Sequence, residues 1–376
     1  MNEIYFDNSA TTKISEIALN KYIETSNLFY ANPASLHKAG FLAEKEVDKA
    51  RKILMKALGG KNEKEIIFTS GGTESDNLAI LGTAMARSKS GKHLITSKIE
   101  HHAVLDCFKY LETQGFEVTY IDVDEKGIIN FEQLKNAVRD DTILISVMTV
   151  NNEVGSIQPI NSLRSIAKNA TIHTDAVQAF GKIDLSSLDV DLISVSAHKV
   201  HGPKGVGALY IKSGTKIKNT VFGGGQEWNM RSGTLNVPAI CAFGVAVNDI
   251  ITNFDNYNQY INDLGQYFIS ELLKIEDVQI NSVNLGNIIN VSFKDIRGEV
   301  LLHYLEEKNI YISTGSACNA KSTKISYVLE AMNVPRNYAE GAVRISLSRY
   351  NTKEEIDIAI NEIKNGVMFL RKFKRR

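Results

Sequence analysis

The chain has 376 residues, and its 43 lysines and arginines are balanced by 43 aspartates and glutamates. At about 150 residues per domain, this length predicts two or three domains' worth of chain and a large core. Because the formal net charge is zero, no overall field favours a nucleic-acid backbone or an anionic membrane, and neither partner is expected.

Cys107, Cys241 and Cys318 are the only cysteines, too few and too far apart for a disulfide framework. None has a neighbour at metal-ligand spacing, so no metal site is predicted. The segment 1–12 lacks the apolar run of a signal peptide, and the longest apolar-leaning run, 237–247, is about half of the ~20 residues that cross a bilayer. We therefore expect a soluble, cytoplasmic protein in a reducing compartment.

Short β-rich runs alternate with helical stretches from about residue 60 to 212. The run at 65–70 precedes a helix predicted from Thr73 to Arg87, and the run at 93–98 precedes one from about Ala103 to Thr113. Further β-rich runs follow as FEVTYIDV, TILISVMTV, TIHTDA and DLISVSA. Parallel strands need a crossover long enough to hold a helix, so this rhythm predicts an α/β fold with a mainly parallel central sheet.

The last third of the chain has a different pattern. Residues 235–275 are helical in pattern, and a shorter mixture follows, with strands predicted at 288–293, 310–317 and 343–348 and a helix near 299–307. This predicts a second, smaller α+β unit. No linker rich in proline, glycine or serine marks the boundary, which we place near 255. The predicted division is a large domain, 13–255, and a small domain, 1–12 plus 256–376.

The segment Thr69-Ser70-Gly71-Gly72-Thr73-Glu74 lies where a predicted strand meets a predicted helix. Exposed backbone N–H groups and the helix dipole favour an anion there, and a phosphate is the expected ligand. The alternative is that Ser70 and Thr73 only cap the helix. The spacing matches neither a dinucleotide-binding motif nor a P-loop.

Two further strand ends carry charged residues. Asp175 ends one apolar run, and Lys199 follows another. An ammonium group at the end of a buried strand is costly unless it is paired or neutralised, and Schiff-base chemistry uses such a lysine. Taken singly, Lys199 also suits a surface position and Asp175 a helix N-cap.

Together these three strand ends match the anchors that pyridoxal 5'-phosphate requires. A helix N-terminus takes the phosphate, a carboxylate keeps the pyridine nitrogen protonated, and a lysine forms the Schiff base. The sequence therefore predicts pyridoxal phosphate as the cofactor.

The sequence resembles the fold-type I pyridoxal-phosphate enzymes, and among them the cysteine desulfurases of the class-V aminotransferase family. The matching motifs run nearly from end to end: YFDNSATT (5–12), ANPASLH (31–37), FTSGGTESDNLAI (68–80), TSKIEHHAVL (96–105), VNNEVG (150–155), HTDAVQAFGK (173–182), SVSAHKVHGPKGVGALY (194–210), GGGQE (223–227), MRSGT (230–234), STGSACNA (313–320) and VRISL (343–347).

The resemblance implies roles for individual residues. Lys199 would bind the cofactor covalently, Asp175 would pair with its ring nitrogen, and His101 would stack on its ring and assist proton transfer. The other residues implied to hold the cofactor are Gly72, Thr73, Asn152, Gln178, Ser196, His198 and, from the other subunit of a homodimer, Thr234. Those implied to bind the substrate carboxylate are Asn32, Asn152 and Arg344.

Cys318 is the residue that distinguishes cysteine desulfurases from related enzymes. Small and polar residues surround it in the segment 313–320, which favours a reactive thiol on a loop over a thiol buried in a core. Cys107 and Cys241 lie in apolar helical stretches, and for these we favour burial.

The activity implied by the resemblance is conversion of L-cysteine to L-alanine, with the sulfur held on Cys318 as a persulfide and passed to an acceptor protein. The segments 4–13 and 29–37 are similar to a branch that serves a tRNA 4-thiouridine sulfurtransferase, and an iron–sulfur scaffold is the alternative acceptor. The competing functions are a selenocysteine lyase or other pyridoxal-phosphate β-lyase, and a non-catalytic scaffold on the same fold.

Two features depart from the family pattern or add to it. Trp228-Asn229 stands where many relatives have Arg-Gly, and the tryptophan suits either an entrance or a dimer contact. The segment 371–376 holds five positive charges, which suit a solvated helix end or the steering of an acidic partner.

Overall fold

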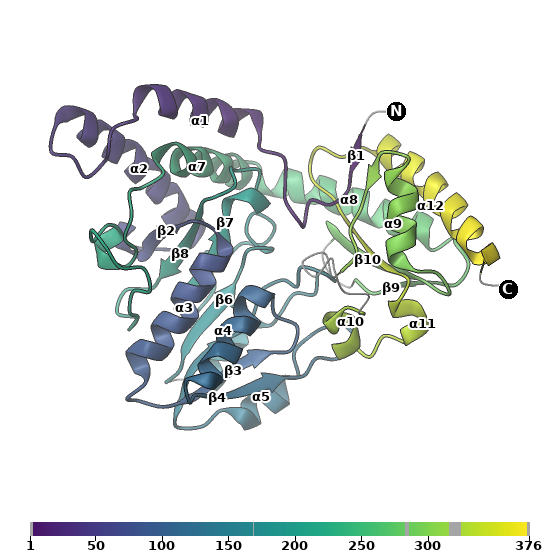
Figure 1. Ribbon diagram of the computed structural model, residues 1–376, viewed down its shortest axis with the longest axis horizontal. Helices are drawn as coiled ribbons and strands as arrows, with labels where there is room; N and C mark the ends of the chain where they lie inside the picture. Colours follow the sequence, from purple (N-terminus) through teal and green to yellow (C-terminus); the bar gives the residue numbers. More distant parts are fainter. Residues whose placement is uncertain (1–2, 168, 283–285, 316–324, 374–376) are drawn as a thin grey trace.

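The computed structural model describes residues 3–167, 169–282, 286–315 and 325–373. Figure 1 shows a larger part around one sheet and a smaller part beside it. Up to residue 252 the elements are β1 (Ile4–Tyr5), α1 (Glu16–Leu28), α2 (Lys38–Ala57), η1 (Glu63–Glu65), β2 (Ile66–Thr69), α3 (Gly72–Arg87), β3 (His93–Ser97), α4 (His102–Thr113), β4 (Glu117–Ile121), α5 (Phe131–Ala137), β5 (Thr142–Ser146), α6 (Ile160–Ile166), β6 (Thr171–Asp175), β7 (Leu192–Ser196), η2 (Ala197–Lys199), β8 (Gly207–Ile211), η3 (Glu227–Asn229) and α7 (Val237–Thr252).

The remaining elements form most of the smaller part. They are α8 (Phe254–Leu272), β9 (Val278–Ile280), β10 (Ile288–Phe293), α9 (Gly298–Glu306), β11 (Ile310–Tyr311), α10 (Tyr327–Ala331), α11 (Arg336–Ala339), β12 (Ala342–Ser346) and α12 (Lys353–Phe373).

In the described part of the chain, the large sheet has seven strands in the order β2-β8-β7-β6-β5-β3-β4. Strands β3 to β7 run parallel, whereas β8 is antiparallel to both of its neighbours. The predicted α/β class is confirmed. β8 reverses because the connection from β7 contains only a short 3₁₀ turn, η2, and a parallel pairing would need a longer crossover.

The central strands are buried along their whole length, as their continuous apolar runs predict for a sheet covered by helices on both faces. The carboxyl ends of parallel strands meet at one edge, so the residues that follow β5, β6 and β7 come together there. This edge includes Asp175 and Lys199.

The smaller part has its own core. β12, β10 and β9 form an antiparallel sheet, and β1 pairs with β11. Ile4 and Phe6 join Phe268 and Phe293 in this second core, so the N-terminal strand belongs with the end of the chain in space. The division at residue 255 is a prediction that lies beside the start of α8.

The segment 7–12 connects the two parts. Asn8 N donates to Ser346 O at 3.3 Å, and Thr12 N donates to His198 O at 2.9 Å. The segment thus runs from β12 to the end of β7, and its backbone carbonyls lie next to Lys199.

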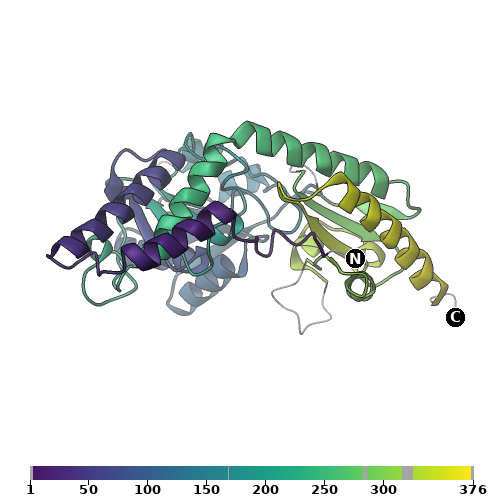
Figure 2. The same ribbon diagram turned by 90° about the horizontal axis from the view of Figure 1, so that it is seen from above.

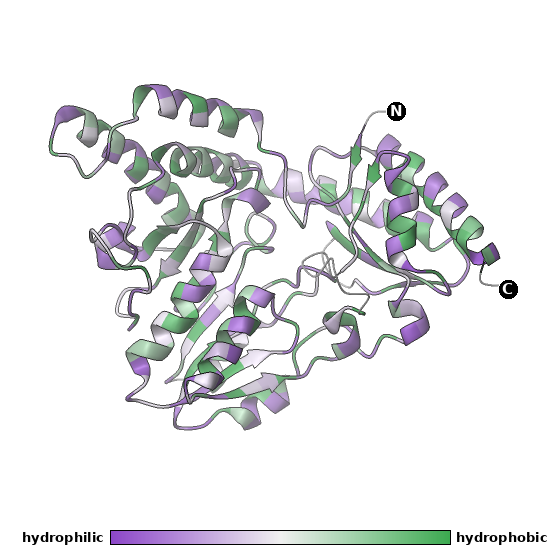
Figure 3. Ribbon diagram, viewed as in Figure 1, coloured by the Kyte–Doolittle hydropathy of each residue, from purple (hydrophilic) through white to green (hydrophobic). Residues whose placement is uncertain are grey.

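α7 and α8 also link the two parts, with α8 running along the top in Figure 2. Among the described residues no single helix is long and apolar enough to cross a membrane, and only α7 and α8 together reach that length and composition, with a bend of 76° between them. α7 is apolar around most of its surface and is buried beneath α1 and α2, as Figure 3 shows by hydropathy. Its composition is that of a core helix.

The predicted strand at 310–317 is shorter in the structure. β11 ends at Tyr311, after which Ser313 pairs with Arg344 of β12 as an isolated bridge. Residues 316 and 317 lie outside the described part of the chain. Element bounds elsewhere agree with the predictions to within about two residues for α3, α4, α9 and β10.

Candidate active site

The N-terminus of α3 has the properties of an anion site. No side chain caps this helix, so the alternative that Ser70 and Thr73 serve as caps is wrong. A Cβ on Gly72 would lie 2.7 Å from Val177 Cγ2, so only glycine leaves room for the backbone here. The Ser196 hydroxyl is buried beside it without a partner among the described residues. The free N–H groups and this hydroxyl suit a phosphate.

Asp175 is buried at the end of β6, and one of its carboxylate oxygens accepts a hydrogen bond from Val177 N at 2.9 Å. Turns follow it rather than a helix, so the helix N-cap alternative is wrong. Burial raises the pKa of Asp175, while the nearby His101 and Lys199 oppose that rise. The carboxylate is therefore within electrostatic reach of the two residues implied to handle protons.

Lys199 ends the short turn η2 after β7, and its position is set by the 7–12 segment. Its Nζ donates to Ala10 O at 2.9 Å and to Ser9 O. These contacts agree with the expectation that a lysine at the end of a buried strand needs hydrogen-bond partners. Lys199 is half-buried and its ammonium is held by two backbone carbonyls, so its position lies between the interior and the surface alternatives.

His101 forms the N-cap of α4, where its Nδ1 accepts a hydrogen bond from Ala103 N at 3.1 Å. This assigns the ring hydrogen to Nε2 when the ring is neutral. Burial lowers the pKa of His101, and the charge of Lys199 lowers it further, whereas Asp175 opposes the shift. The ring is therefore held mainly neutral.

Gln178 and His198 lie close to the same backbone segment. Gln178 Nε2 donates to Ser9 O at 2.8 Å, the carbonyl that Lys199 also contacts. His198 Nδ1 lies 3.2 Å from Thr11 Oγ1. Burial, with the charges of Lys199 and Lys204, lowers the pKa of His198 to about 4, so its ring is neutral at pH 7.

Arg344 on β12 has the geometry of a carboxylate site. Its guanidinium is buried and donates to Asp7 Oδ1 at 2.8 Å and to Asn152 O at 2.9 Å. Arg344 Nε and Asn152 Oδ1 have no hydrogen-bond partner among the described residues. Buried polar atoms without partners are uncommon, and here they leave a donor and an acceptor for a ligand.

The comparisons with known proteins cover nearly the whole chain. Residues 4–358 match the family model described as aminotransferase class-V. Proteins named cysteine desulfurase IscS from Dictyoglomus turgidum and Methanosarcina thermophila are each 46% identical to this chain; both alignments cover 98% of it and 95% and 93% of those proteins. The chain belongs to the cysteine desulfurases of the class-V aminotransferase family.

A solved structure titled NifS-like protein matches this desulfurase-family chain with a TM-score of 0.92 at 40% identity, covering 98% of this chain and 100% of that one. The resemblance inferred from the motifs is therefore confirmed at the level of family and fold.

Within the single desulfurase chain, most residues implied to bind the cofactor come together. Asp175, His101 and Lys199 influence one another electrostatically, and Gly72 lies beside Ser196. Cys318, the predicted nucleophile, lies outside the described residues. Ser313 lies five residues before Cys318 in the sequence, and its backbone exchanges hydrogen bonds of 3.0 and 2.7 Å with Arg344.

Asn32 and Thr234 are not brought to this site within one chain. Asn32 is exposed on the loop between α1 and α2, which lies at the outer end of the larger part in Figures 1 and 2. Its side chain accepts from Ala34 N at 2.9 Å. Thr234 is exposed between η3 and α7. Thr234 was implied to act from the other subunit, and that role stays a prediction. The role of Asn32 was implied without a second subunit, and its place on this outer loop does not bring it to the site.

Several charged residues of the site were missed in the sequence analysis. Asp7 pairs with Arg344, and the buried carboxyls Asp76 and Glu100 lie near Asp175. Burial raises the pKa of Glu100 to about 8, and the charge of Asp175 adds to this rise. Asp7 is part of the YFDNSATT motif, which could have indicated it. The sequence gives no such signal for Asp76 and Glu100, because only their burial distinguishes them from ordinary surface carboxylates.

The predictions for the other cysteines are confirmed. Cys107 and Cys241 are both buried and unpaired. Burial raises the pKa of Cys107 to about 12 and that of Cys241 to about 11, so neither is a thiolate at neutral pH.

Trp228 lies on a turn that the family comparison had marked as unusual. Its ring covers the Arg51 guanidinium at 4.6 Å, and Arg51 in turn pairs with the adjacent Glu227 at 2.7 and 2.8 Å. The tryptophan thus replaces a charge with a cation–π contact. It is 41% exposed, and its role at an entrance or a dimer contact remains open to test.

Proposed function

We propose that the chain is a pyridoxal-phosphate-dependent cysteine desulfurase that moves the sulfur of L-cysteine to Cys318. The reaction is L-cysteine plus the Cys318 thiol giving L-alanine plus the Cys318 persulfide, so one sulfur atom changes carrier and no outside oxidant is needed. The observation that carries this proposal is the meeting of Lys199, Asp175 and the uncapped α3 N-terminus at one sheet edge.

The residues at this edge fit pyridoxal phosphate. Its phosphate would bind at the α3 N-terminus, to Gly72, Thr73, Ser196 and His198. In support, the buried Ser196 hydroxyl has no hydrogen-bond partner among the described residues, and a side chain at Gly72 would contact Val177. Asp175 would face its ring nitrogen, and Gln178 and Asn152 would contact the ring substituents. When bound, the cofactor supplies an electron sink that weakens bonds at the substrate's α-carbon.

The substrate carboxylate would bind to Arg344. Asp7 and the Asn152 carbonyl hold the guanidinium in place while its Nε remains available. A guanidinium that is already oriented loses little freedom on binding and gives a charge-assisted contact. Asn152 Oδ1 is positioned to accept from the substrate amino group or from a bound water.

Proton movement would fall to Lys199 and His101. Lys199 Nζ takes the proton from the substrate α-carbon, because it is the basic nitrogen that the 7–12 segment keeps at the sheet edge. Neutral His101 presents Nε2–H as a hydrogen-bond donor to the substrate and assists proton transfer by orienting it. The low pKa of His198 removes a competing cation from the same region.

Cys318 would receive the sulfur. It is five residues after Ser313, whose backbone is bonded to Arg344, and five residues span at most about 17 Å. A thiol on a segment of this length can reach a substrate bound to Arg344.

We propose that the persulfide then passes to a protein acceptor, with a tRNA 4-thiouridine sulfurtransferase favoured and an iron–sulfur scaffold as the alternative. A cytoplasmic location remains a prediction, to be checked by cell fractionation.

We further propose a homodimer as the active unit, because the resemblance implies that Thr234 reaches the cofactor phosphate from the other subunit. In its support, Thr234 is exposed between η3 and α7, where it is open to contact from a second copy.

The proposal is tested by loading the purified chain with pyridoxal phosphate, recording its visible spectrum and measuring alanine formed from L-cysteine. We expect a visible band, and we expect alanine formation to fall at least about 100-fold in Cys318→Ala, with the band retained. Cys241→Ala is the matched control, since that thiol is buried in α7, and it should keep its activity. Full alanine and sulfide release by Cys318→Ala would contradict the desulfurase assignment and favour a β-lyase.

The acceptor is tested separately with sulfur-labelled L-cysteine. The charged enzyme is mixed with a 4-thiouridine sulfurtransferase or with an iron–sulfur scaffold protein, and label on the acceptor is measured. Transfer to the sulfurtransferase at least about 10-fold faster than to the scaffold is expected, and the reverse order would overturn the preference.

A further inference from the structure

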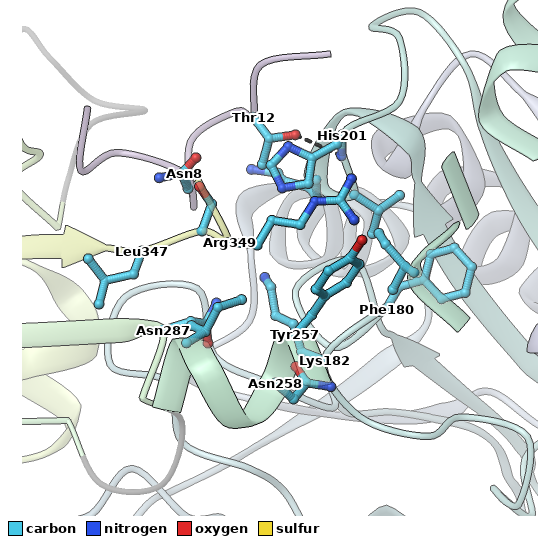
Figure 4. A pocket seen from close by; sticks show the side chains of 16 residues that line it. Asn8, Thr12, Phe180, Lys182, His201, Tyr257, Asn258, Asn287, Leu347 and Arg349 are labelled. Carbon is cyan, nitrogen blue, oxygen red and sulfur yellow. Dashed lines mark hydrogen bonds between the residues drawn. The ribbon is translucent and has the colours of Figure 1, made fainter. Parts of the chain in front are cut away.

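A small cavity, lined by apolar side chains and several polar ones, lies beside Lys199. Its volume is about 50 Å³, enough for on the order of three water molecules. Figure 4 shows the side chains that line it, which include Lys182, His201, Asn258, Asn287 and Arg349. The amides of Asn258 and Asn287 each have a polar atom without a partner among the described residues. These groups favour a hydrated cavity over a dry one.

Lys182 is the charged group in this cavity for which the proposed reaction gives no role. Its Nζ donates to Gln178 Oε1 at 3.1 Å, and within the described residues no carboxylate forms an ion pair with it. Burial lowers the pKa of Lys182 to about 7, and the charges of Lys199 and Arg344 contribute to the shift. An interior lysine without a carboxylate partner is expensive to keep and is found mainly where its charge has a use.

Lys182 fixes the orientation of Gln178. A protonated Lys182 can only donate and a backbone carbonyl can only accept, so while Lys182 carries its proton Gln178 directs Oε1 to Lys182 and Nε2 to Ser9 O. One hydrogen on Nε2 remains. Gln178 therefore keeps one N–H donor for a ligand, while Lys182 occupies one of the two acceptor positions of its Oε1.

The same arrangement connects Lys182 to Lys199. Ser9 O accepts from both Gln178 Nε2 and Lys199 Nζ, so a continuous set of hydrogen bonds runs from Lys182 to Gln178, to Ser9 and to Lys199. Both lysines also line the cavity. A change in the charge of Lys182 therefore alters the electrostatic environment of the Lys199 nitrogen.

Charged and titratable groups face Lys182 from several elements of the fold. Lys199 follows β7 and Arg344 lies on β12, and both are cationic. His201 is kept neutral at pH 7, because burial and the nearby cations lower its pKa to about 4. Arg349 is neutralised by its ion pair with Asp249 of α7. The net effect around Lys182 is positive.

We propose that Lys182 is a positioning residue for the cofactor site: through Gln178 it presents a hydrogen-bond donor to the cofactor's ring oxygen, and its charge favours the uncharged form of the Lys199 nitrogen. This inference rests on the proposed function, because it assumes that pyridoxal phosphate binds at Lys199 with its ring oxygen at Gln178. Lys182 itself does not touch the reacting atoms.

The test is a pH titration of the visible absorption band of the protein loaded with pyridoxal phosphate. Lys182→Met removes the charge and the donor at similar length, and we expect the midpoint of the titration to rise by about one pH unit. Lys182→Arg keeps the charge and should stay near the wild-type midpoint. Lys89→Met, at an exposed turn after α3, is the control and should not shift it.

A double variant separates positioning from a general loss of structure. In a Gln178→Met background the shift caused by Lys182→Met should fall to less than about half, because the connecting amide is gone. A wild-type midpoint in Lys182→Met, or an equal shift in both backgrounds, would overturn the inference. Should Lys182→Met fold poorly, an unshifted midpoint in Gln178→Met overturns it instead. A wild-type protein that gains no visible band would refute the proposed function, and this inference with it.

Discussion

Glu153 shows at the scale of one residue how burial creates a titrating group. Its Oε2 accepts from Ser326 Oγ at 2.5 Å, and a Cβ on Gly315 would lie 2.3 Å from the same oxygen. Burial raises its pKa to about 7, against the opposing effects of Ser326 and Arg344. Glu153 thus contacts the described residues on both sides of the segment that carries Cys318.

The raised pKa of Glu153 makes stability depend on pH. Between about pH 4.5 and 7 the folded protein holds a proton that the unfolded chain releases, so stability falls as pH rises through this window. Glutamine does not titrate. We therefore expect the free energy of unfolding of Glu153→Gln, relative to wild type, to increase by about 2–3 kcal/mol from pH 5 to pH 8 in urea titrations.

The control for this measurement is Glu340→Gln, which changes an exposed carboxylate paired with Arg336 at 2.9 Å. Its stability difference from wild type should change by less than about 0.5 kcal/mol over the same range. Parallel curves for Glu153→Gln and wild type would show that Glu153 is ionised in the folded protein throughout.

At the scale of an element, the turn η3 stores backbone strain. Glu227, Trp228 and Asn229 have φ of 48°, 52° and 66°, a left-handed run that residues with side chains disfavour. The run persists because Glu227 is held from two directions. Its carboxylate pairs with Arg51 of α2 and accepts from Phe68 N of β2 at 2.8 Å.

Glu227→Gln should release this turn. Removing one partner of a buried ion pair leaves the Arg51 charge uncompensated, at a cost of about 3–5 kcal/mol. We expect the free energy of unfolding in urea to fall by about 3 kcal/mol. Glu63→Gln is the matched control, since its pair with Lys52 of the same helix α2 is exposed, and it should cost less than about 1 kcal/mol. Equal effects of the two variants would argue against the anchoring role.

At the scale of the whole molecule, the outer surface of α1 and α2 is unusually apolar. The exposed side chains there are Ile17, Leu19, Ile23, Leu28, Tyr30, Leu36, Phe41 and Leu42. Large exposed apolar surfaces mark interaction sites. This surface includes side chains of the loop that carries Asn32, and it suits the homodimer proposed above.

Glutamates on this surface should prevent the dimer. We expect Ile23→Glu combined with Leu28→Glu to sediment as a monomer and to bind pyridoxal phosphate at least about 10-fold more weakly, because Thr234 would no longer reach a partner's phosphate site. The control is Ile358→Glu, at a comparably exposed position on α12 of the smaller part. A double variant that remains a dimer with unchanged cofactor affinity would place the interface elsewhere.

The α/β class and the residues at the strand ends could be predicted from the amino-acid sequence alone. Short apolar runs specify the buried strands, and the carboxyl ends of parallel strands must share an edge, so Asp175 and Lys199 could be assigned to one site from their positions in the chain. The burial of Cys107 and Cys241 followed in the same way from the apolar helices around them.

The pairing of Asp7 with Arg344 and the interior positions of Lys182 and Glu153 became evident only in the folded structure. These depend on contacts between residues far apart in the chain, which a local pattern does not encode. A lysine or glutamate acquires a shifted pKa only when packing removes water from it. For the same reason the distance of Asn32 from the site became evident only once α1 and α2 were placed in space.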